Sequence, residues 1–539
     1  MRLRPDVEVV RLVQGADTDV VAVPGLSTST TPPDPSAVAW TAPAMRSIGL
    51  AATQPAGGHP ASLPPPVALA ARGPGARRSP IRVAPRRASP AHADRMEHLD
   101  VVIVGGGQAG LSLSWWLRLF GIDHVVLERG RVGESWRSGR WDSFTLVTPA
   151  WMTRLPGLTQ PAGTAASFTD RATLIEMFER YRSGLPARCG VGVTSLRQDG
   201  SRYRLLTTAG ELIARSVIVA SGAQCVVTIP ALAQAMPDHM AHLHAGTYRN
   251  PDEVRPGAVL VIGSGQSGGQ IAEELARAGR RVFLCTSRVG RVPRRYRGRD
   301  VHDWTQEMGL ADQTPDQLAN PAEMRAPHPL LSGARGGHTV ALQQLGRDGV
   351  VLLGRAVRME GTTLHLGDDL LANLWHADER AALFRGAVDA YVERSALVAP
   401  AALPDPTERP LGSFDDPRQL DLVGHEVRTV IWCTGFGPDT GWVDLPILDG
   451  RRHVVSRGGV TTAPGVYTLG APWLTHQSSG LLAGVGKDAS RIALDVAAFL
   501  GASVPADLPG GPAPPSPATR PTARPAPAAA GLSMGLAFG

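Results

Sequence analysis

Three glycines and one carboxylate stand at a spacing that could bind a dinucleotide. Gly105, Gly107 and Gly110 follow the apolar run Val101–Val104, and Glu128 ends a second apolar run 23 residues after Gly105. Such glycines permit a tight turn, close approach of the backbone to a pyrophosphate, and close packing of a helix on a strand. The N-terminus of the helix that follows offers free N–H groups to phosphates, and the carboxylate can accept hydrogen bonds from two ribose hydroxyls. The stretch therefore predicts strand, turn, helix and strand around the ADP half of a cofactor.

A second unit of the same kind lies downstream. Gly263, Gly265 and Gly268 repeat the glycine spacing after another apolar run, but the next predicted strand, Val282–Cys285, ends in Thr-Ser-Arg288 without an acid. The missing acid removes repulsion against a 2′-phosphate, and the Arg288 guanidinium could pair with that phosphate. The second unit therefore favours NADP over NAD, and the two units together indicate an FAD protein that NADPH reduces. Three more arginines follow closely, and we expect each to be a solvated surface charge: Arg291, Arg294 and Arg295.

The order of these units predicts the fold class and the domains. We expect an α/β chain with two Rossmann-like dinucleotide-binding domains, the NADP domain being inserted in the FAD domain. The FAD domain would comprise residues 96–235 and 426–500, and the NADP domain with an extension residues 236–425. The ends, 1–95 and 501–539, are rich in Pro and Ala and are expected to be disordered.

The ends also carry the charge of the chain. Of the formal net charge of +6, residues 1–95 supply +5 and the tail after Leu500 supplies +1, so the body is close to neutral. We therefore expect no nucleic-acid partner, and no apolar run is long enough for a membrane span. Met96 stands just before the first strand, which suggests that residues 1–95 are non-native. The alternative is a targeting segment, although Arg86-Arg87 precede no apolar core.

The cysteines are scattered through the body without a C-x-x-C pair: Cys189, Cys225, Cys285 and Cys433. This distribution favours a reducing, cytoplasmic compartment and disfavours a disulfide reductase, which needs a redox-active pair. No metal-ligand cluster stands out, so no metal site is expected.

Further segments resemble flavin-containing monooxygenases of class B, the group that includes Baeyer–Villiger and N-hydroxylating enzymes. Gly133, Trp136 and Arg137 are similar to a G-G-x-W-R-like segment that lies against the flavin in these proteins, with Glu134 in place of a glycine. The segment VIWCTGF (430–436) resembles the one that leads back to the flavin domain. The segment TTAPGVYTLG (461–470) resembles the second FAD fingerprint, in which Gly470 would pass the ribityl and phosphate groups. A glycine-opened helix at 480–493 would then direct its N–H groups to the flavin O2.

The hallmark of the group, F-x-G-x-x-x-H-x-x-x-[YFW], is matched only in its second half. His244 and Tyr248 supply that half and are the candidate catalytic residues, whereas Asp238 and Met240 replace Phe and Gly. A plain linker histidine is the alternative interpretation of His244. Residues 300–425 are read as an extension that could cover the active site. It would contain a hairpin of 349–353 with 363–366 and an amphipathic helix at 370–397.

The resemblance implies an NADPH-dependent FAD monooxygenase that oxygenates a small organic substrate with O2 through a flavin C4a-(hydro)peroxide. One alternative is a flavin-dependent NAD(P)H oxidoreductase or dehydrogenase that forms no stable peroxyflavin. A disulfide reductase and a non-catalytic, redox-sensing flavoprotein are further alternatives.

Overall fold

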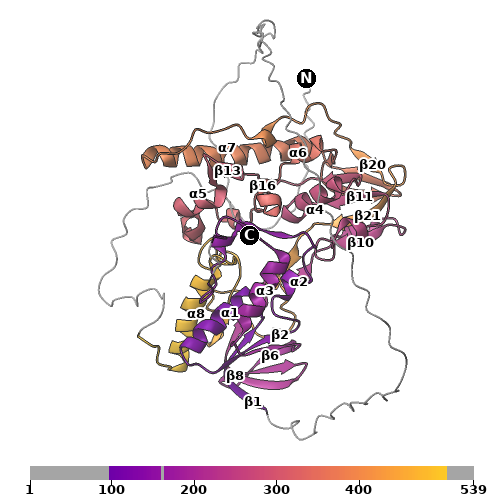
Figure 1. The fold of residues 1–539 in the computed structure, drawn as a ribbon. Coiled ribbons are helices and arrows are strands. Elements are labelled where there is room, and N and C mark those ends of the chain that lie inside the picture. Colours follow the sequence, from indigo (N-terminus) through magenta and orange to yellow (C-terminus); the bar gives the residue numbers. More distant parts are fainter. Residues whose placement is uncertain (1–95, 160–162, 507–539) are drawn as a thin grey trace, which may run out of the picture. The chain divides into compact units, whose positions relative to one another are not determined.

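The computed structural model describes residues 96–159 and 163–506 (Figure 1). The expectations for residues 1–95 and for most of the tail lie outside these residues. The chain has the predicted α/β class, with two separate sheets that contain parallel strands.

The first sheet holds the first glycine turn. Its strands run in the order β5-β2-β1-β8-β7-β6, with β23 paired to the end of β8. Residues 101–104 of β1 are buried, as expected for a parallel strand covered on both faces. Strands β7 and β8 form a hairpin, with Leu205 opposite Leu212. The strands of this sheet are β1 Glu97–Val104, β2 His124–Glu128, β5 Ala187–Cys189, β6 Val193–Asp199, β7 Arg202–Thr207, β8 Gly210–Val219 and β23 Val466–Thr468.

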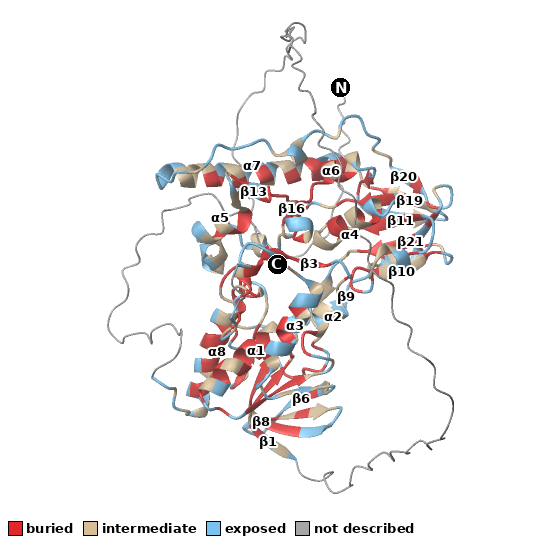
Figure 2. Cartoon of the chain, viewed as in Figure 1, coloured by how far each residue is buried: buried red, intermediate tan, exposed pale blue. Residues whose placement is uncertain are grey.

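Helices α1 Gln108–Leu119 and α8 Val485–Leu500 pack against each other beside this sheet (Figure 1). Helix α3, Arg171–Arg182, begins where the side chain of Asp170 accepts a hydrogen bond from the Thr173 N–H at 2.8 Å, a standard N-cap. The inner faces of these helices and the strands share one buried apolar cluster. Most residues of both sheets are buried, whereas the outer faces of the helices are exposed (Figure 2).

The second sheet holds the second glycine turn and is parallel throughout, in the order β10-β21-β11-β12-β17. Its strands are β10 Ala241–His244, β11 Ala258–Ile262, β12 Val282–Cys285, β17 Val351–Leu353 and β21 Val427–Trp432. The helices that accompany it are α4 Gln266–Arg277, α5 Val301–Glu307, α6 Leu342–Arg347 and α7 Leu370–Arg394. Helix α7 confirms the amphipathic helix expected at 370–397, three residues shorter.

Two sequence predictions are corrected by this sheet. Strand β21 pairs with both β10 and β11, so residues 427–432 complete the second sheet, and the boundary predicted at residue 426 falls too early. The chain returns toward the first sheet only at β22 Phe436–Gly437, which pairs with β9 Val226–Val227. The hairpin of 349–353 with 363–366 is wrong, because the apolar strand β17 joins the edge of the parallel sheet beside β12. Residues 363–366 pair instead with β18 Ala356–Glu360.

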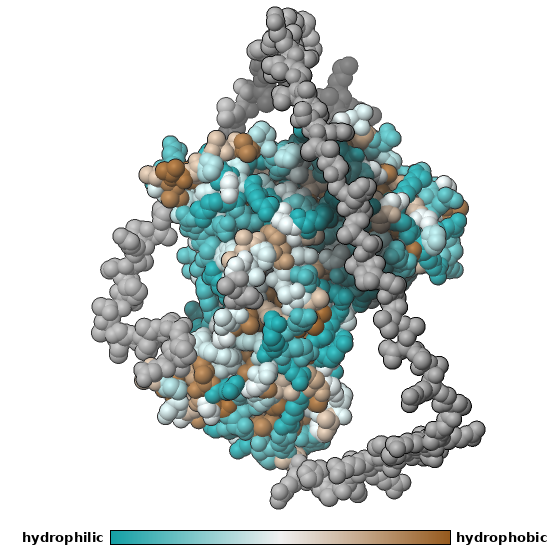
Figure 3. Space-filling model, in the orientation of Figure 1, coloured by the Kyte–Doolittle hydropathy of each residue, from teal (hydrophilic) through white to brown (hydrophobic). Residues whose placement is uncertain are grey.

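The remaining strands and one short helix belong to small hairpins and connections. They are α2 Glu134–Arg137, β3 Thr145–Pro149, β4 Phe168–Asp170, β13 Arg295–Tyr296, β14 Arg299–Asp300, β15 Leu331–Ser332, β16 His338–Thr339, β19 Thr363–Leu366 and β20 Gln419–Asp421. The face shown in Figure 3 is mostly hydrophilic, with scattered hydrophobic residues. Across 96–159 and 163–506, no helix has both the length and the apolar character that crossing a membrane requires.

Candidate functional site

Each glycine of the first turn has a different steric role. A Cβ at Gly105, where φ is 119°, would lie 2.3 Å from the carbonyl oxygen of Ala220. A Cβ at Gly110 would lie 2.0 Å from the carbonyl oxygen of Gly105, because α1 lies directly on β1 at this point. Gly107 is different, since nothing lies within 4 Å of its Cβ position. The space beside Gly107 is therefore open to a ligand, while the other two glycines are needed by the fold itself.

Helix α1 begins at this open space. Its N-cap is Gly107, which has no side chain to satisfy the first N–H groups of the helix. Such N–H groups and the positive end of the helix dipole attract an anion. The turn therefore fits the pyrophosphate of a dinucleotide.

Glu128 lies beside the turn, as the sequence predicts. One of its carboxylate oxygens accepts the Gly106 N–H at 2.7 Å, and the other accepts the Gly130 N–H at 2.8 Å. A Cβ at Gly106 would lie 2.8 Å from the Glu128 Cβ, so only glycine allows this approach. Each carboxylate oxygen keeps further acceptor capacity. The carboxylate is thus fixed in place and still able to accept from ribose hydroxyls.

The second turn repeats this arrangement. A Cβ at Gly263 would lie 2.6 Å from the Cys433 carbonyl oxygen, and a Cβ at Gly268 would lie 1.8 Å from the Gly263 carbonyl oxygen. At Gly265, the N-cap of α4, nothing lies within 4 Å of the Cβ position. The second turn therefore presents the same open N-terminus to a second pyrophosphate.

The two units differ where the ribose acid stands. In the second unit the Ser264 N–H donates to the Ser287 hydroxyl at 3.4 Å, and the Ser287 N–H donates to the Ser264 hydroxyl at 2.9 Å. A pair of neutral hydroxyls thus takes the place of the Gly106–Glu128 contact. No negative charge is left at this position to repel a 2′-phosphate.

Arg288 is exposed next to this serine pair, and α7 adds further basic groups that the sequence did not reveal. The Arg288 Nε–H donates to Nδ1 of His376 at 3.3 Å. Burial, together with the charges of Arg288 and Arg380, lowers the pKa of His376. Arg380 also approaches the exit of β12, since a Cβ at Gly290 would lie 3.1 Å from its Cγ. These residues of α7 are about 90 positions from Arg288 in the sequence, so only the fold brings them together.

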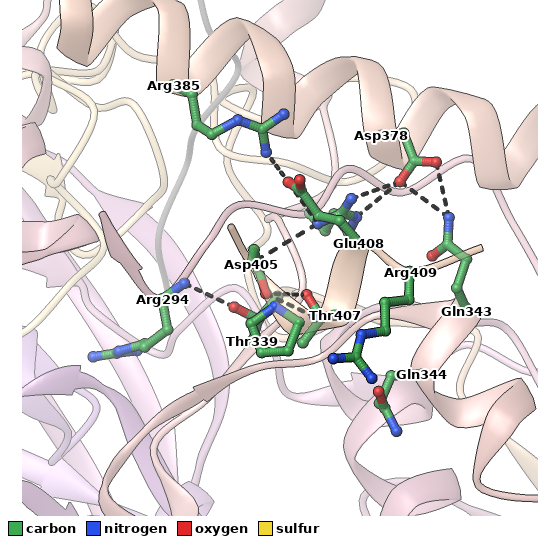
Figure 4. A network of polar contacts seen from close by, with 12 residues as sticks. Arg294, Thr339, Gln343, Gln344, Asp378, Arg385, Asp405, Thr407, Glu408 and Arg409 are labelled. Atoms are coloured by element: carbon green, nitrogen blue, oxygen red, sulfur yellow. Dashed lines mark hydrogen bonds and ion pairs between the residues drawn. The ribbon is translucent and has the colours of Figure 1, made fainter. Parts of the chain in front are cut away.

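The expectation of three solvated arginines is wrong for two of them. Arg291 is 2% exposed and Arg294 is 3% exposed. Arg291 pairs with Asp378 of α7 at 2.7 Å and lies near Asp405 and Glu408. These three carboxylates belong to the polar network drawn in Figure 4. Arg294 pairs with Asp300 at 2.8 Å. Carboxylates stabilise both charges, distant in the sequence for Arg291 and six residues away for Arg294, so neither arginine is free to bind a phosphate.

Arg295 is exposed as expected, and its guanidinium donates to the carbonyl oxygens of Gly336 at 2.7 Å and Gly337 at 3.0 Å. It is thus held by the backbone of its own extension. Of the four arginines, Arg288 remains the best candidate for the 2′-phosphate.

His244 and Tyr248, the candidate catalytic residues, are both buried and fully engaged by the chain. The His244 Nδ1 accepts the Gly246 N–H at 3.1 Å, so its Nε2–H donates to the Gly435 carbonyl oxygen at 3.1 Å. Burial lowers the pKa of His244. The Tyr248 hydroxyl donates to Glu274 at 2.8 Å, and burial raises the pKa of that hydroxyl. Because His244 contacts the return connection at Gly435, the geometry supports its interpretation as a linker histidine.

Trp136 and Arg137 follow Gly133, whose φ of 67° allows the sharp entry into α2. The Trp136 ring lies 5.9 Å from that of Phe144, and the Arg140 guanidinium lies 5.1 Å above it. Arg137 donates to the Val132 carbonyl oxygen at 3.1 Å and pairs with Glu179. These contacts hold α2 against the first domain. Part of the Trp136 ring remains exposed.

Gly470 carries the chain past the start of α1. Its φ is 88°, and a Cβ there would lie 2.8 Å from the Ala109 Cβ. The helix predicted from residue 480 begins only at Val485, because residues 480–484 form turns in which Gln108 donates to the Gly480 carbonyl oxygen at 2.6 Å. The helix therefore starts five residues later than predicted, and the N–H groups of Val485 and Lys487 donate to the carbonyl oxygens of Leu481 and Gly484.

The cysteines form no redox pair: all four are free thiols. Burial raises the pKa of Cys285 and of Cys433 to about 12. Thiols with such pKa values are poor nucleophiles at neutral pH. Within the described part of the chain there is also no cluster of residues that could hold a metal ion.

Comparison with known proteins agrees with this geometry. The family described as pyridine nucleotide-disulphide oxidoreductase matches residues 102–307. An uncharacterized CzcO-like oxidoreductase of Geobacillus kaustophilus is 27% identical over 407 residues, which is 74% of this chain and 99% of that protein. The rice (Oryza sativa subsp. japonica) indole-3-pyruvate monooxygenase YUCCA1 is 27% identical over 43% of this chain and 58% of its own length.

A solved structure shows the same fold. A flavin monooxygenase from Stenotrophomonas maltophilia matches with a TM-score of 0.51 and 21% identity, over 75% of this chain and all of that chain. Two dinucleotide turns, one with a ribose acid and one without, thus occur within a fold shared with flavin monooxygenases.

The chain is a flavin-dependent oxidoreductase that shares its fold with a flavin monooxygenase. Its cofactors are FAD and NADP(H). The assignment of individual residues to these cofactors remains our prediction.

Proposed function

We propose that this protein is an NADPH-dependent FAD monooxygenase that oxygenates a small organic molecule with O2. The observation that carries the proposal is the pair of open glycine positions, Gly107 and Gly265, each at the start of a helix and only one of them beside an acid. The relative named as an indole-3-pyruvate monooxygenase supports oxygenation as the reaction class. The absence of a cysteine pair disfavours reduction of disulfides.

When bound, FAD would supply the chemistry: it would take electrons from NADPH and use them to activate O2 for oxygenation of the substrate. The chain must hold both dinucleotides and keep water from the site. Glu128 and the first turn of α1 would hold the ADP half of FAD. The first turn of α4 would hold the pyrophosphate of NADPH, and Arg288 would hold its 2′-phosphate.

A second candidate is a flavin-dependent NAD(P)H oxidoreductase that passes electrons on without oxygenating a substrate. The replacement of two hallmark positions by Asp238 and Met240 favours it. So does the complete engagement of His244 and Tyr248 by their own chain.

Rapid mixing of the NADPH-reduced enzyme with O2 distinguishes the two. Monooxygenation predicts an absorbance intermediate, distinct from reduced and oxidised flavin, that lasts longer when NADP+ is present. Direct return to oxidised flavin with stoichiometric hydrogen peroxide, with and without NADP+, would refute the proposal.

The four free thiols lead us to propose a reducing, cytoplasmic setting, which fractionation of the source cells would test.

A further inference from the structure

The segment between Gly470 and Val485 links the two halves of the site. At one end it contacts the start of α1, through Gly470 against Ala109 and through Gly480 bound to Gln108. In its middle it contacts the other half of the chain. The Gln477 N–H donates to the Gln313 carbonyl oxygen at 2.9 Å, and the Ser478 N–H donates to the Ala311 carbonyl oxygen at 3.2 Å. The segment therefore joins the half of the chain that would hold FAD to the half that would hold NADPH.

A buried polar cluster is built into this segment. His476 is 6% exposed and Asp488, in the first turn of α8, is 1% exposed. The Thr475 hydroxyl joins them: it donates to the Asp488 carboxylate and lies 2.7 Å from the His476 Nδ1. The Ser479 hydroxyl accepts the N–H groups of Thr475 at 3.1 Å and His476 at 3.0 Å. The Ser479 hydroxyl also lies 3.2 Å from the His476 Nδ1, so two hydroxyls fix the orientation of the imidazole.

The other nitrogen of this imidazole has no partner. His476 Nε2 is buried and makes no hydrogen bond, and the same holds for Oδ2 of Asp488 and for the indole N–H of Trp473. A buried polar atom left without a partner costs on the order of 1–3 kcal/mol. Trp473 also has φ of 55°, in the left-handed region that favours glycine. Unpaired atoms and backbone strain concentrated in one segment are typical of a ligand site.

The second dinucleotide unit has a parallel arrangement. Gln266 occupies the position in the second turn that Gln108 has in the first, and its side chain donates to the Pro329 carbonyl oxygen at 2.6 Å. The neighbouring His328 has a buried Nδ1 without a partner, and burial lowers its pKa to about 4. In both units the glutamine of the glycine turn therefore binds a loop that contains a histidine with a buried ring nitrogen that has no partner.

We propose that His476 contacts the flavin head of bound FAD through Nε2, and that Asp488 is a positioning residue that acts on it through Thr475. The free nitrogen, its buried surroundings and the course of the segment between the two halves of the site all point to this role. The proposal rests on FAD binding and does not require that the enzyme oxygenates its substrate.

A pair of variants of similar shape tests the contact. His476→Gln keeps a hydrogen-bonding atom near the position of Nε2, whereas His476→Met does not, and both lose the bond at Nδ1. We expect the FAD dissociation constant, measured by titrating apoprotein while following flavin fluorescence, to be about 3- to 10-fold higher for Met than for Gln. We expect the apoprotein melting temperature to be the same or higher for Met, because an unpaired polar atom has been removed.

His124 supplies the control, since it is buried in the same half and both of its ring nitrogens are bonded, to Ser114 and to the Ile122 carbonyl oxygen. His124→Gln and His124→Met should lower the melting temperature and leave FAD dissociation constants that agree with each other. Equal constants for the two His476 variants would overturn the proposal. A higher FAD dissociation constant for His476→Met would also overturn the proposal if the apoprotein lost stability to the same extent.

Thr475→Val, which keeps the imidazole but removes its link to Asp488, is the second variant. A higher FAD dissociation constant with unchanged apoprotein stability supports the positioning role of Asp488. An unchanged FAD dissociation constant overturns it. If the unmutated protein does not bind FAD at all, the cofactor assignment fails rather than the role of His476.

Discussion

Substitution of Gly107 by valine should block the cofactor site and leave the fold unchanged. The backbone at Gly107 has φ of −87° and ψ of −168°, an extended conformation that any residue adopts, and nothing lies within 4 Å of the Cβ position. The protein itself therefore tolerates the side chain. A pyrophosphate could not bind at the start of α1 in this variant, because the valine methyl groups would occupy its place.

The magnitude follows from the hydrogen bonds that are lost. A charge-assisted bond contributes about 1.5–3 kcal/mol, so two N–H groups of the first turn of α1 contribute about 3–6 kcal/mol to FAD binding. We expect Gly107→Val to raise the FAD dissociation constant by about 10²- to 10⁴-fold. The purified variant should be colourless, with an FAD-to-protein ratio near zero, while its apoprotein melting temperature stays that of wild-type apoprotein.

Gly110→Val is the matched control. Its Cβ would lie 2.0 Å from a backbone carbonyl oxygen, so α1 must move away from β1 and the apoprotein itself should melt at a lower temperature or fail to fold. A Gly107→Val protein that stays yellow with one FAD per chain would refute the assignment of the site. A variant as unstable as Gly110→Val would refute the argument that this position is open.

Three further predictions concern the second domain and stability. Arg288→Ala combined with Arg380→Ala should raise the apparent constant for NADPH by about 10- to 150-fold and leave that for NADH nearly unchanged, as steady-state kinetics with both nucleotides would show. Burial lowers the pKa of His328 from its ordinary value of 6.5 to about 4, so between these values the unfolded chain binds a proton that the folded chain does not. The free energy of unfolding should therefore decrease as the pH falls through this window, by at most about 3 kcal/mol, and His328→Gln should reduce the decrease measured by urea unfolding at several pH values. Arg291→Met should lower the free energy of unfolding by about 3 kcal/mol, because it removes the buried guanidinium that pairs with Asp378 and lies near Asp405 and Glu408; a loss below about 1 kcal/mol in urea unfolding would contradict this.

The local features of the nucleotide sites could be predicted from the sequence because they depend on neighbours in the chain. The glycine turns, the strands beside them and the position of Glu128 all follow from spacing and apolar runs, and the structure places them as expected. The second unit was predictable for the same reason, including the absence of an acid after β12. Hydrophobic periodicity also identified α7.

Features that depend on distant partners could not be predicted. The burial of Arg291 requires Asp378, Asp405 and Glu408, none of which is near it in the sequence. Strand β21 could be read as part of the return to the first domain because its own residues do not specify which sheet it joins. The cluster around His476 was likewise hidden, since Asp488 is recognisable as its partner only when α8 is in place.

The central claim is that one chain holds FAD at its first turn and NADPH at its second, and that hydride passes between them. Gly265→Val tests it directly, because the Cβ position is open and the first turn is untouched. The variant should be purified with FAD and be reduced by dithionite, but mixing it with NADPH without oxygen should bleach the flavin absorbance far more slowly than in wild type at the same nucleotide concentration. Bleaching at the wild-type rate, or reduction of the wild type by NADH as readily as by NADPH, would contradict the account.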